Sequence, residues 1–398
     1  MRIRYTTGKG GKPVKKASVY TAKEHGIDPR LVDPDARRVI QRLRDSGHEA
    51  YIVGGAVRDL ILGKDPKDFD IATDATPNRI KRLFRNARII GRRFRLVHIF
   101  FGPKIFEVST FRSLAEGSVG NSFGSIDEDV QRRDFSCNAL YYEPGQNIVV
   151  DYIGGVDDIR KGRLRPVIPR DRIFVEDPVR MLRAAKYSTG TGLSLSFLLK
   201  RQIRREAPLL KPVSPSRLTE ELMKVISSGK AASLVKAFRD LNLFRWIQPA
   251  ANALMDNSGA YAKAYEKSLI ELDALRKEMI SDEVELVPLL ACMLRDFIDT
   301  RVDWSIETGE TFRELMREAR AFILPMNPPR IAFEKAVRKV YLDNGVPSKR
   351  LKRQERIPAG DGGETGSAPV ARKRRRRRRR PADGSGSAGS SPRETLET

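Results

Sequence analysis

Residues 51–70 read YIVGGAVRDLILGKDPKDFD, the stretch with the clearest structural signal in the chain. Tyr51-Ile52-Val53 predicts a strand that breaks at Gly54-Gly55. Ala56 to Leu62 then has the spacing of a short helix with one apolar face. A second strand is predicted to carry Asp68-Phe69-Asp70. The stretch therefore predicts a strand, a glycine turn, a helix and a strand in quick succession.

This arrangement suits the binding of a phosphate and a metal ion. Two glycines after a strand let a phosphate approach the backbone, because no Cβ stands in the way. Amide groups at the helix start and the guanidinium of Arg58 supply positive potential. Side chains two positions apart on a strand point to the same side, so Asp68 and Asp70 present two carboxylates to one place. Mg²⁺ is commonly held by one or two carboxylates together with substrate phosphates, so the spacing predicts a Mg²⁺ site with these two ligands.

The composition indicates a polyanionic partner. The 398 residues carry a formal net charge of +24, which favours nucleic acid, although an anionic membrane surface fits the charge alone. No apolar run of about 20 residues occurs, so we expect no membrane span. The two cysteines, Cys137 and Cys292, lack the spacing of a zinc site and fit a reducing cytoplasm. The sequence also lacks the Walker loop GxxxxGK[ST], which argues against a Walker-type ATPase.

The motif GGxVRD at residues 54–59, followed by DFD at 68–70, resembles the active-site signature of the class II nucleotidyltransferases. That family comprises the CCA-adding tRNA nucleotidyltransferases and the bacterial poly(A) polymerases. The resemblance implies an α+β protein whose catalytic head has a small mixed sheet with helices on one face. All-helical neck and body domains and a disordered basic tail would follow. It also implies two Mg²⁺ ions on the aspartate pair and ATP phosphates cradled by the glycine turn and Arg58.

The predicted division of the chain has five parts. They are a flexible basic arm at 1–24, a nucleotidyltransferase head at 25–155, a helical neck at 156–245 that reads the nucleotide and binds RNA, a helical body at 246–348, and a disordered Arg-rich tail at 349–398. The tail contains an unbroken run of nine basic residues, Arg372 to Arg380. We expect such a run to bind RNA, since each neutralised phosphate releases counterions, although a solvated charge run without a role fits the same composition.

Further residues extend the resemblance to the family. Arg133 and Asp134 belong to a segment similar to the family's RRDF motif, which implies a nucleotide contact for Arg133 and a third acidic residue of the site in Asp134. A helix-starting ion pair is the alternative for these two. Glu107, in a predicted strand, is either a ligand or orienting group beside the aspartates or an exposed strand carboxylate. Arg112 either reaches the triphosphate or pairs with Glu107.

Residues 176–183, EDPVRMLR, resemble the family's base-reading motif EDxxR. Asp177 and Arg180, three apart on a predicted helix, would lie side by side, and their donors and acceptors would select adenine without a template strand. A salt bridge on a solvated face is the alternative. Arg183 continues the same stripe towards the nucleotide. Lys186 stands where the tRNA enzymes commonly have another arginine, and because lysine lacks the planar fork we do not expect it to read a base.

The segment 85–98, RNARIIGRRFRLVH, and the Arg-rich tail resemble the poly(A) polymerase branch. The resemblance therefore implies a template-independent polynucleotide adenylyltransferase. Such an enzyme adds AMP from ATP to single-stranded RNA 3′ ends regardless of sequence and promotes RNA turnover. CCA addition to tRNA is the first alternative. A non-catalytic RNA-binding protein with a relic head is the second, and the intact Asp68 and Asp70 argue against it.

Overall fold

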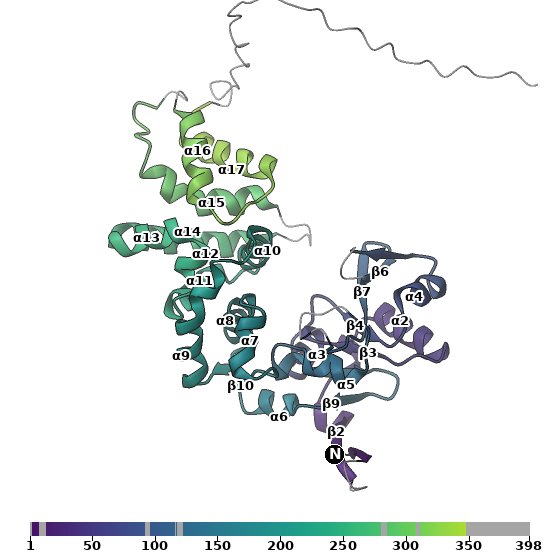
Figure 1. The fold of residues 1–398 in the computed structure, drawn as a ribbon. Helices are drawn as coiled ribbons and strands as arrows, with labels where there is room; N and C mark the ends of the chain where they lie inside the picture. The colour runs from purple at the N-terminus through teal and green to yellow at the C-terminus, as the bar shows by residue number, and fades with distance from the viewer. Residues whose placement is uncertain are drawn as a thin grey trace, which may run out of the picture. The chain divides into compact units, whose positions relative to one another are not determined.

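The computed structural model describes residues 2–7, 13–91, 96–115, 117, 122–279, 285–307 and 311–347. The tail predicted at 349–398 lies outside the described residues, so the expectation of disorder there stays a prediction. The remaining architecture, a sheet-containing head followed by helical domains, confirms the α+β class (Figure 1).

A nine-stranded mixed sheet forms the head, with strand order β1-β2-β9-β8-β3-β4-β7-β6-β5. The pair β4–β7 is parallel and the other neighbouring strands are antiparallel. The strands are β1 Arg2–Thr7, β2 Pro13–Thr21, β3 Ala50–Val53, β4 Asp70–Thr73, β5 Ala87–Ile90, β6 Leu96–Phe101, β7 Lys104–Thr110, β8 Leu140–Glu143 and β9 Ile148–Asp151.

Short helices connect these strands. They are α1 Ala22–His25, η1 Pro29–Leu31, α2 Pro34–Asp45, α3 Gly55–Ile61, α4 Pro77–Leu83, α5 Ile126–Gln131, η2 Ser136–Asn138 and α6 Gly155–Arg160. Asp33 caps α2 by accepting from the Asp35 amide, and Pro34 occupies the first turn, where no backbone donor is needed. The side chains of Val39, Ile40 and Leu43 then face the sheet and are buried.

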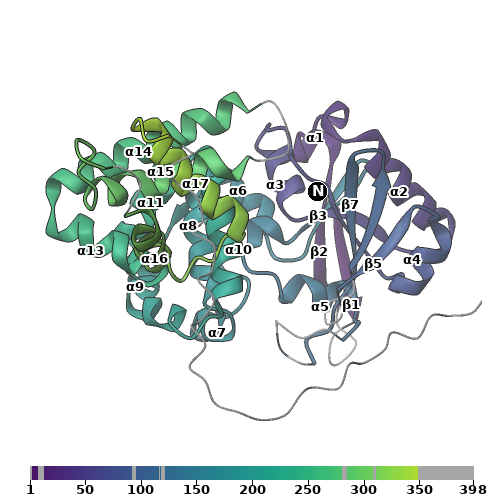
Figure 2. The same cartoon turned by 90° about the horizontal axis from the view of Figure 1, so that it is seen from above.

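The sheet has helices on both faces, so the expectation of helices on one face is wrong. On one side, α2 packs on β3 and β4, and α4 packs on β5 and β6; Figure 2 shows both helices on the same side of the sheet. On the other side a second core contains Tyr51, Phe111 and Tyr141 of the sheet region together with Ile126 and Val130 of α5.

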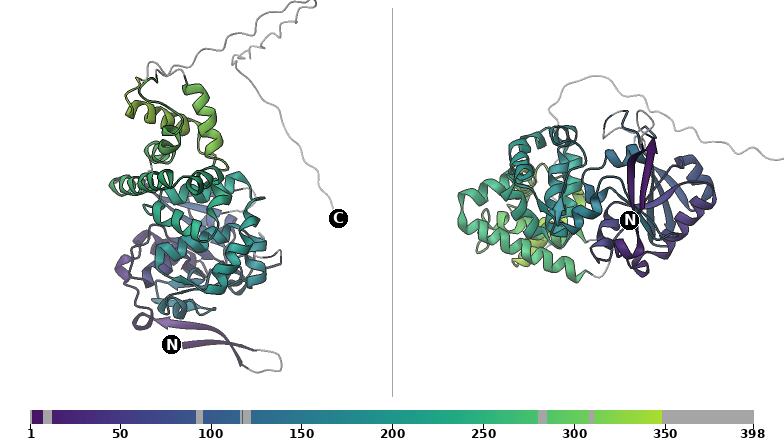
Figure 3. Two further views of the ribbon diagram at one scale, coloured as in Figure 1. Left: turned by 90° about the vertical axis from the view of Figure 1, so that its left-hand side faces the viewer. Right: turned by 90° about the horizontal axis from the view of Figure 1, so that it is seen from below.

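The expectation of a flexible basic arm at 1–24 is wrong for its described residues. They form β1, β2 and most of α1, and β2 pairs with β9 through Ser18 and Asp151. Ala17, Val19 and Tyr20 are buried, so apolar contacts outweigh the basic composition around them. Figure 3 shows this hairpin, in dark purple, at the edge of the sheet. The head therefore includes the first strands of the chain.

Helices make up almost all of the described chain after α6. They are α7 Arg170–Glu176, α8 Val179–Thr191, α9 Phe197–Glu206, η3 Ala207–Leu210, α10 Pro215–Ile226, α11 Ala231–Asp240, α12 Phe244–Ile247, α13 Pro249–Asn257, α14 Gly259–Glu278, α15 Leu286–Asp299, α16 Phe312–Phe322 and α17 Arg330–Asp343. The short parallel strands β10 Arg163–Leu164 and β11 Ser194–Leu195 interrupt them. Among the described helices, none combines the length and apolar character that crossing a bilayer requires.

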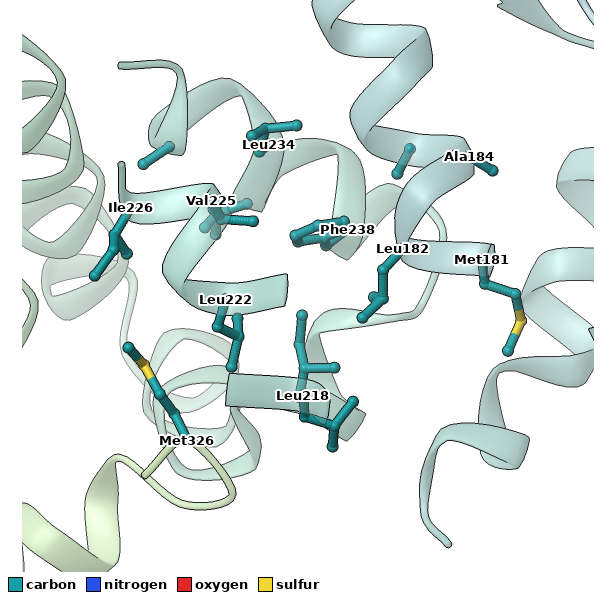
Figure 4. Close-up of a cluster of buried hydrophobic side chains, with 14 of the residues drawn as sticks. Met181, Leu182, Ala184, Leu218, Leu222, Val225, Ile226, Leu234, Phe238 and Met326 are labelled. Carbon is teal, nitrogen blue, oxygen red and sulfur yellow. The ribbon is translucent and has the colours of Figure 1, made fainter. Parts of the chain in front are cut away.

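The packing of α8 against α10 and α11 fixes the part of the neck that faces the head. Leu182 of α8, Leu218 and Leu222 of α10, and Leu234 and Phe238 of α11 are buried in one cluster, drawn in Figure 4. Burying each such side chain contributes roughly 1.5–3 kcal/mol. The polar faces of α8 and α10 are consequently held in fixed positions.

Candidate active site

A cavity of about 890 Å³ lies between the head and the helices α8 and α10. Its walls contain ten of the eleven residues predicted for the site from the sequence. These are Gly54, Gly55, Arg58, Asp70, Arg112, Arg133, Asp134, Asp177, Arg180 and Arg183. Asp68 is not one of the lining residues, but its charge acts on Asp70.

The glycine turn between β3 and α3 forms one end of this cavity. Gly54 has φ 72° and ψ −130°, a conformation that only glycine adopts without strain. A Cβ on Gly55 would lie 3.5 Å from Nη2 of Arg58, so the guanidinium rests against the backbone. Arg58 donates to Asp59 at 2.9 and 3.0 Å and to Oδ1 of Asn138 at 2.7 Å. The positive charge beside the turn is thus held in one orientation.

Carboxylates gather where β4 begins. The parallel pairing of β4 with β7, extended by one residue, sets Asp70 beside Glu107. Asp70 is exposed to the cavity, yet the surrounding protein disfavours its charge, and with the repulsion of Glu107 and Asp68 this raises its pKa to about 6. Among the described residues, neither Asp68 nor Asp70 takes part in an ion pair or hydrogen bond. The pair is therefore a crowded negative site, which the charges of Arg133 and Lys224 offset only in part.

Asp134 lies in the same cavity but in different surroundings. Its Oδ1 accepts from the Phe135 amide at 2.7 Å and from Nδ2 of Asn138 at 3.2 Å. Its charge acts on Arg180 and Arg183, whereas the carboxylates that act on Asp70 are Glu107 and Asp68. The structure therefore brings Glu107, rather than Asp134, next to Asp70.

A network of hydrogen bonds holds Arg133 behind the glycine turn, and the sequence motif that contains Arg133 does not reveal this network. Its Nη2 donates to Oδ2 of Asp129 at 3.0 Å and its Nε to the Tyr141 hydroxyl at 2.9 Å. The Tyr141 hydroxyl also donates to Asp129 at 2.7 Å. The Arg112 amide donates to the other oxygen of Asp129 at 3.3 Å. Asp129 was not predicted, although its position four residues before Arg133 on a helical segment is a usable signal.

The neck side of the cavity differs from the sequence prediction at Asp177. Asp177 and Arg180 do not share a helix, because Asp177 is extended, with φ −150° and ψ 96°, and α8 starts at Val179. Pro178 explains the break, since a proline disfavours helical geometry in the preceding residue. The carboxylate of Asp177 accepts from Nη2 of Arg217 at 2.9 Å on both oxygens. Arg180 instead donates to the carbonyl of Ile173 at 3.1 Å.

Glu221 of α10 organises the next two cations of the neck. Its carboxylate accepts from Nζ of Lys186 at 2.7 Å and from Nε of Arg183 at 3.4 Å. Burial alone would raise the pKa of Glu221, but the charge of Lys186 and its hydrogen bond lower it. Lys186 is thus held by a carboxylate. Nothing in the sequence near Glu221 identifies its role, because its partners Arg183 and Lys186 lie on another helix, 38 and 35 positions earlier in the chain.

Comparison with known proteins identifies the family. The sequence profile described as "Poly A polymerase head domain" matches residues 50–165, and that described as "Probable RNA and SrmB- binding site of polymerase A" matches residues 192–255. The chain is 40% identical over 333 residues to Poly(A) polymerase I of Escherichia coli O6:H1, covering 78% of this chain and 70% of that protein. The chain belongs to the poly(A) polymerase family.

Other relatives agree with this membership of the poly(A) polymerase family. Poly(A) polymerase I of Salmonella typhi is 38% identical over 287 residues, which cover 68% of this chain and 61% of that protein. The chain therefore spans less than two thirds of that relative's length. The crystal structure of the Bacillus stearothermophilus CCA-adding enzyme in complex with CTP has the same fold, with a TM-score of 0.53 and 24% identity over 78% of this chain and 83% of that chain.

Proposed function

We propose that this poly(A) polymerase family member is a polynucleotide adenylyltransferase of the cytoplasm that adds AMP from ATP to RNA 3′ ends without a template and promotes RNA turnover. One observation carries the proposal. Asp70 and Glu107 face the same cavity as the Gly54-Gly55 turn and the base-side pair Asp177 and Arg180. Carboxylates suited to metal ions, a turn that a phosphate can approach and side chains suited to reading a base thus line one cavity, where a single nucleotide could meet all of them.

Asp68 and Asp70 are proposed to hold two Mg²⁺ ions together with the substrate phosphates. The donor set fits, because these are hard oxygen ligands whose mutual repulsion a divalent cation would relieve. The described residues contain no cluster of three or more carboxylate, histidine or cysteine side chains able to form a metal site alone, so phosphate oxygens would complete the coordination. When bound, the ions supply activation of the RNA 3′-hydroxyl and neutralisation of the leaving pyrophosphate.

The chain's own residues would position the nucleotide. The backbone at Gly54-Gly55 lets the triphosphate approach, and Arg58 and Arg133 place fixed positive charge beside it. Arg112 reaches the same cavity and adds to that charge. Electrostatic preorganisation of this kind stabilises developing charge without reorganisation during the reaction.

The neck is proposed to select adenine. The carboxylate of Asp177 can accept from an exocyclic amine and the guanidinium of Arg180 can donate to a ring nitrogen, and both line the cavity. Arg217 holds Asp177, so the base-reading carboxylate is oriented before the nucleotide arrives. Arg183, held by Glu221, extends the cationic wall on the same side.

Glu107 and Asp134 are proposed to have different tasks. Glu107 is the carboxylate beside Asp70. It fits the role of the third acidic residue, at the place where the RNA 3′-hydroxyl would bind. Asp134 receives its hydrogen bonds from Phe135 and Asn138 and faces the neck arginines, so it fits an orienting role. The tail at 349–398 would bind RNA of any sequence through its positive charge.

A single assay tests the proposal and its alternatives. The purified protein is incubated with Mg²⁺, a generic RNA primer or a tRNA lacking CCA, and each nucleoside triphosphate in turn. Long tails made from ATP alone support the proposal. Addition of C, C and A that stops on the truncated tRNA would establish CCA addition instead, and binding without any product would leave only an RNA-binding protein.

The aspartate pair is tested in the same assay. Asp70→Ala and Asp68→Ala should each lower AMP incorporation by at least about a thousand-fold, because metal-assisted charge stabilisation is lost. RNA binding, measured by filter retention, should change less than about two-fold, since neither carboxylate attracts phosphate. Normal turnover in either variant would refute the assignment of these two metal ligands.

A further inference from the structure

The strands β5, β6 and β7 have one covered face and one open face. The covered face packs on α2 and α4, and Val97 and Ile99 point into that core and are buried. Leu96, His98 and Phe100 alternate with them along β6 and are only half-buried. Figures 1 and 2 show α2 and α4 on one side of these strands. Leu96 and Glu107 lie on the open face, and both also line the cavity of the candidate active site.

The strand register places a row of polar side chains on this open face. His98 of β6 pairs with Glu107 of β7, and Arg88 of β5 pairs with His98. Asp70 of β4 stands beside Glu107 on the other side. The row therefore runs across four strands as Asp70, Glu107, His98 and Arg88. Three strand spacings of about 4.8 Å put Arg88 roughly 14 Å from Asp70.

An apolar platform lies next to that row. Phe100 of β6 pairs with Ile105 of β7, whose surface is 52% exposed. The Arg88 guanidinium lies 5.5 Å from the centroid of the Phe100 ring, and the His98 ring meets Phe100 edge-on at 6.3 Å. A half-buried aromatic ring on the open face of a sheet, with an exposed aliphatic side chain and a guanidinium beside it, can stack a base and bind the adjoining phosphate.

The geometry of phosphoryl transfer indicates what should approach from this side. In an in-line displacement, the attacking hydroxyl and the leaving group lie on opposite sides of the phosphorus atom. The glycine turn follows β3, which flanks β4 on one side, whereas β7, β6 and β5 follow one another on the other side. If the triphosphate occupies the turn, the RNA 3′-hydroxyl comes from the β7 side.

We propose that the open face of β5 to β7 binds the last nucleotides of the RNA acceptor strand, with Phe100 and Ile105 under a base and Arg88 at a phosphate. The inference rests on the proposed adenylyl transfer and adds the path by which RNA enters. Since a stacked base and a paired phosphate carry no sequence information, this path accepts any 3′ end.

Steady-state kinetics with a short oligoadenylate primer test the path. Arg88→Ala and Phe100→Ala should each raise KM for the primer about ten-fold while leaving KM for ATP within two-fold, as expected for loss of one phosphate contact or one stacked base. Phe100→Trp should restore the primer KM because it keeps the stacking surface. Lys81→Ala is the matched control, since Lys81 is an exposed cation on α4 of the covered side, and its primer KM should not change.

Crosslinking gives an independent measurement that does not depend on turnover. A primer with 5-bromouridine at the penultimate position should crosslink within residues 86–91 or 96–105 of the wild-type protein, as mapped by mass spectrometry. Unchanged primer KM in both alanine variants, or crosslinks confined to the helices after α6, would overturn the path. Absence of AMP incorporation by the wild-type protein would instead reject the adenylyl transfer itself, so the two failures are distinguishable.

Discussion

Asp70, a proposed metal ligand, shows how one residue can oppose the stability of its own fold. Its carboxylate lies beside Glu107 and Asp68, and the described residues give it no ion pair or hydrogen bond. In the unfolded chain the three charges are apart and hydrated, so folding without a metal concentrates negative charge. Carboxylates with a raised pKa cluster at functional sites, which agrees with the proposed role of Asp70 as a metal ligand.

Asp70→Asn should therefore stabilise the metal-free protein in a pH-dependent way. The folded-state pKa of about 6 lies above the ordinary value of 3.8, so the wild type loses stability as pH rises through that window and has lost it fully above pH 6. In EDTA, the Tm of the variant should exceed that of the wild type at pH 7.5, and the difference should shrink towards pH 4. An equal difference at both pH values would contradict the charge explanation.

Glu221 is the residue on the neck side whose loss should be costly. It is buried and receives Lys186 and Arg183, so Glu221→Ala leaves two partly buried cations without their carboxylate. We expect the free energy of unfolding to fall by about 2 kcal/mol. Glu220→Ala is the control, because Glu220 is 65% exposed and pairs with Lys224 at the surface. Its effect, measured by urea denaturation, should stay below about 1 kcal/mol.

At the scale of elements, the turn between β3 and α3 depends on one backbone conformation. Gly54→Ala forces an L side chain into a left-handed region, and we expect destabilisation by about 1–2 kcal/mol together with weaker ATP binding. Gly190→Ala is the counterpart inside α8, where an added Cβ meets nothing within 4 Å. That change should stabilise the protein by about 0.5–1 kcal/mol. Thermal unfolding and ATP titration of both variants provide the measurement.

Elements were predictable from the sequence where the local signals agreed. The helix α2, Pro34–Asp45, is one such element, because a capping aspartate, a first-turn proline and apolar spacing coincide there. The strand at β2 was missed because its lysines conceal a short apolar alternation that only pairing with β9 makes decisive. The prediction that Asp177 lies on a helix is wrong. Its spacing to Arg180 fits a helix, but Pro178 disfavours helical geometry at Asp177.

The candidate site divides in the same way. Ten of the eleven residues predicted for the site line one cavity, because the glycine turn and the charged motifs are local patterns. The expectation that one strand carries both aspartates is wrong, since β4 begins at Asp70 and Asp68 precedes it. Glu221 was not recognisable, since it lies 35 positions after Lys186 in the sequence and meets it only when the two helices pack together. Residues that hold others in place depend on tertiary contacts, and a single sequence does not encode their partners locally.

At the scale of the whole molecule, the net charge of +24 and the basic run Arg372 to Arg380 support the proposal that the tail binds RNA. Deletion of residues 349–398 should weaken RNA binding and flatten its salt dependence, because fewer phosphates are neutralised. Turnover on saturating primer should be retained within about two-fold, since the predicted catalytic residues all lie earlier in the chain. Binding isotherms between about 50 and 300 mM KCl provide the slope. An unchanged slope would exclude the tail as an RNA contact.

The pairing of β2 with β9 has a practical consequence for expressing this protein in pieces. A fragment that starts at residue 25 would contain every motif of the head yet would uncover the outer edge of β9, Ile148–Asp151. A bare strand edge of mostly apolar residues is a template for pairing between molecules. Such a fragment should aggregate during purification, whereas in the intact chain β2 pairs with that edge of β9 and covers it.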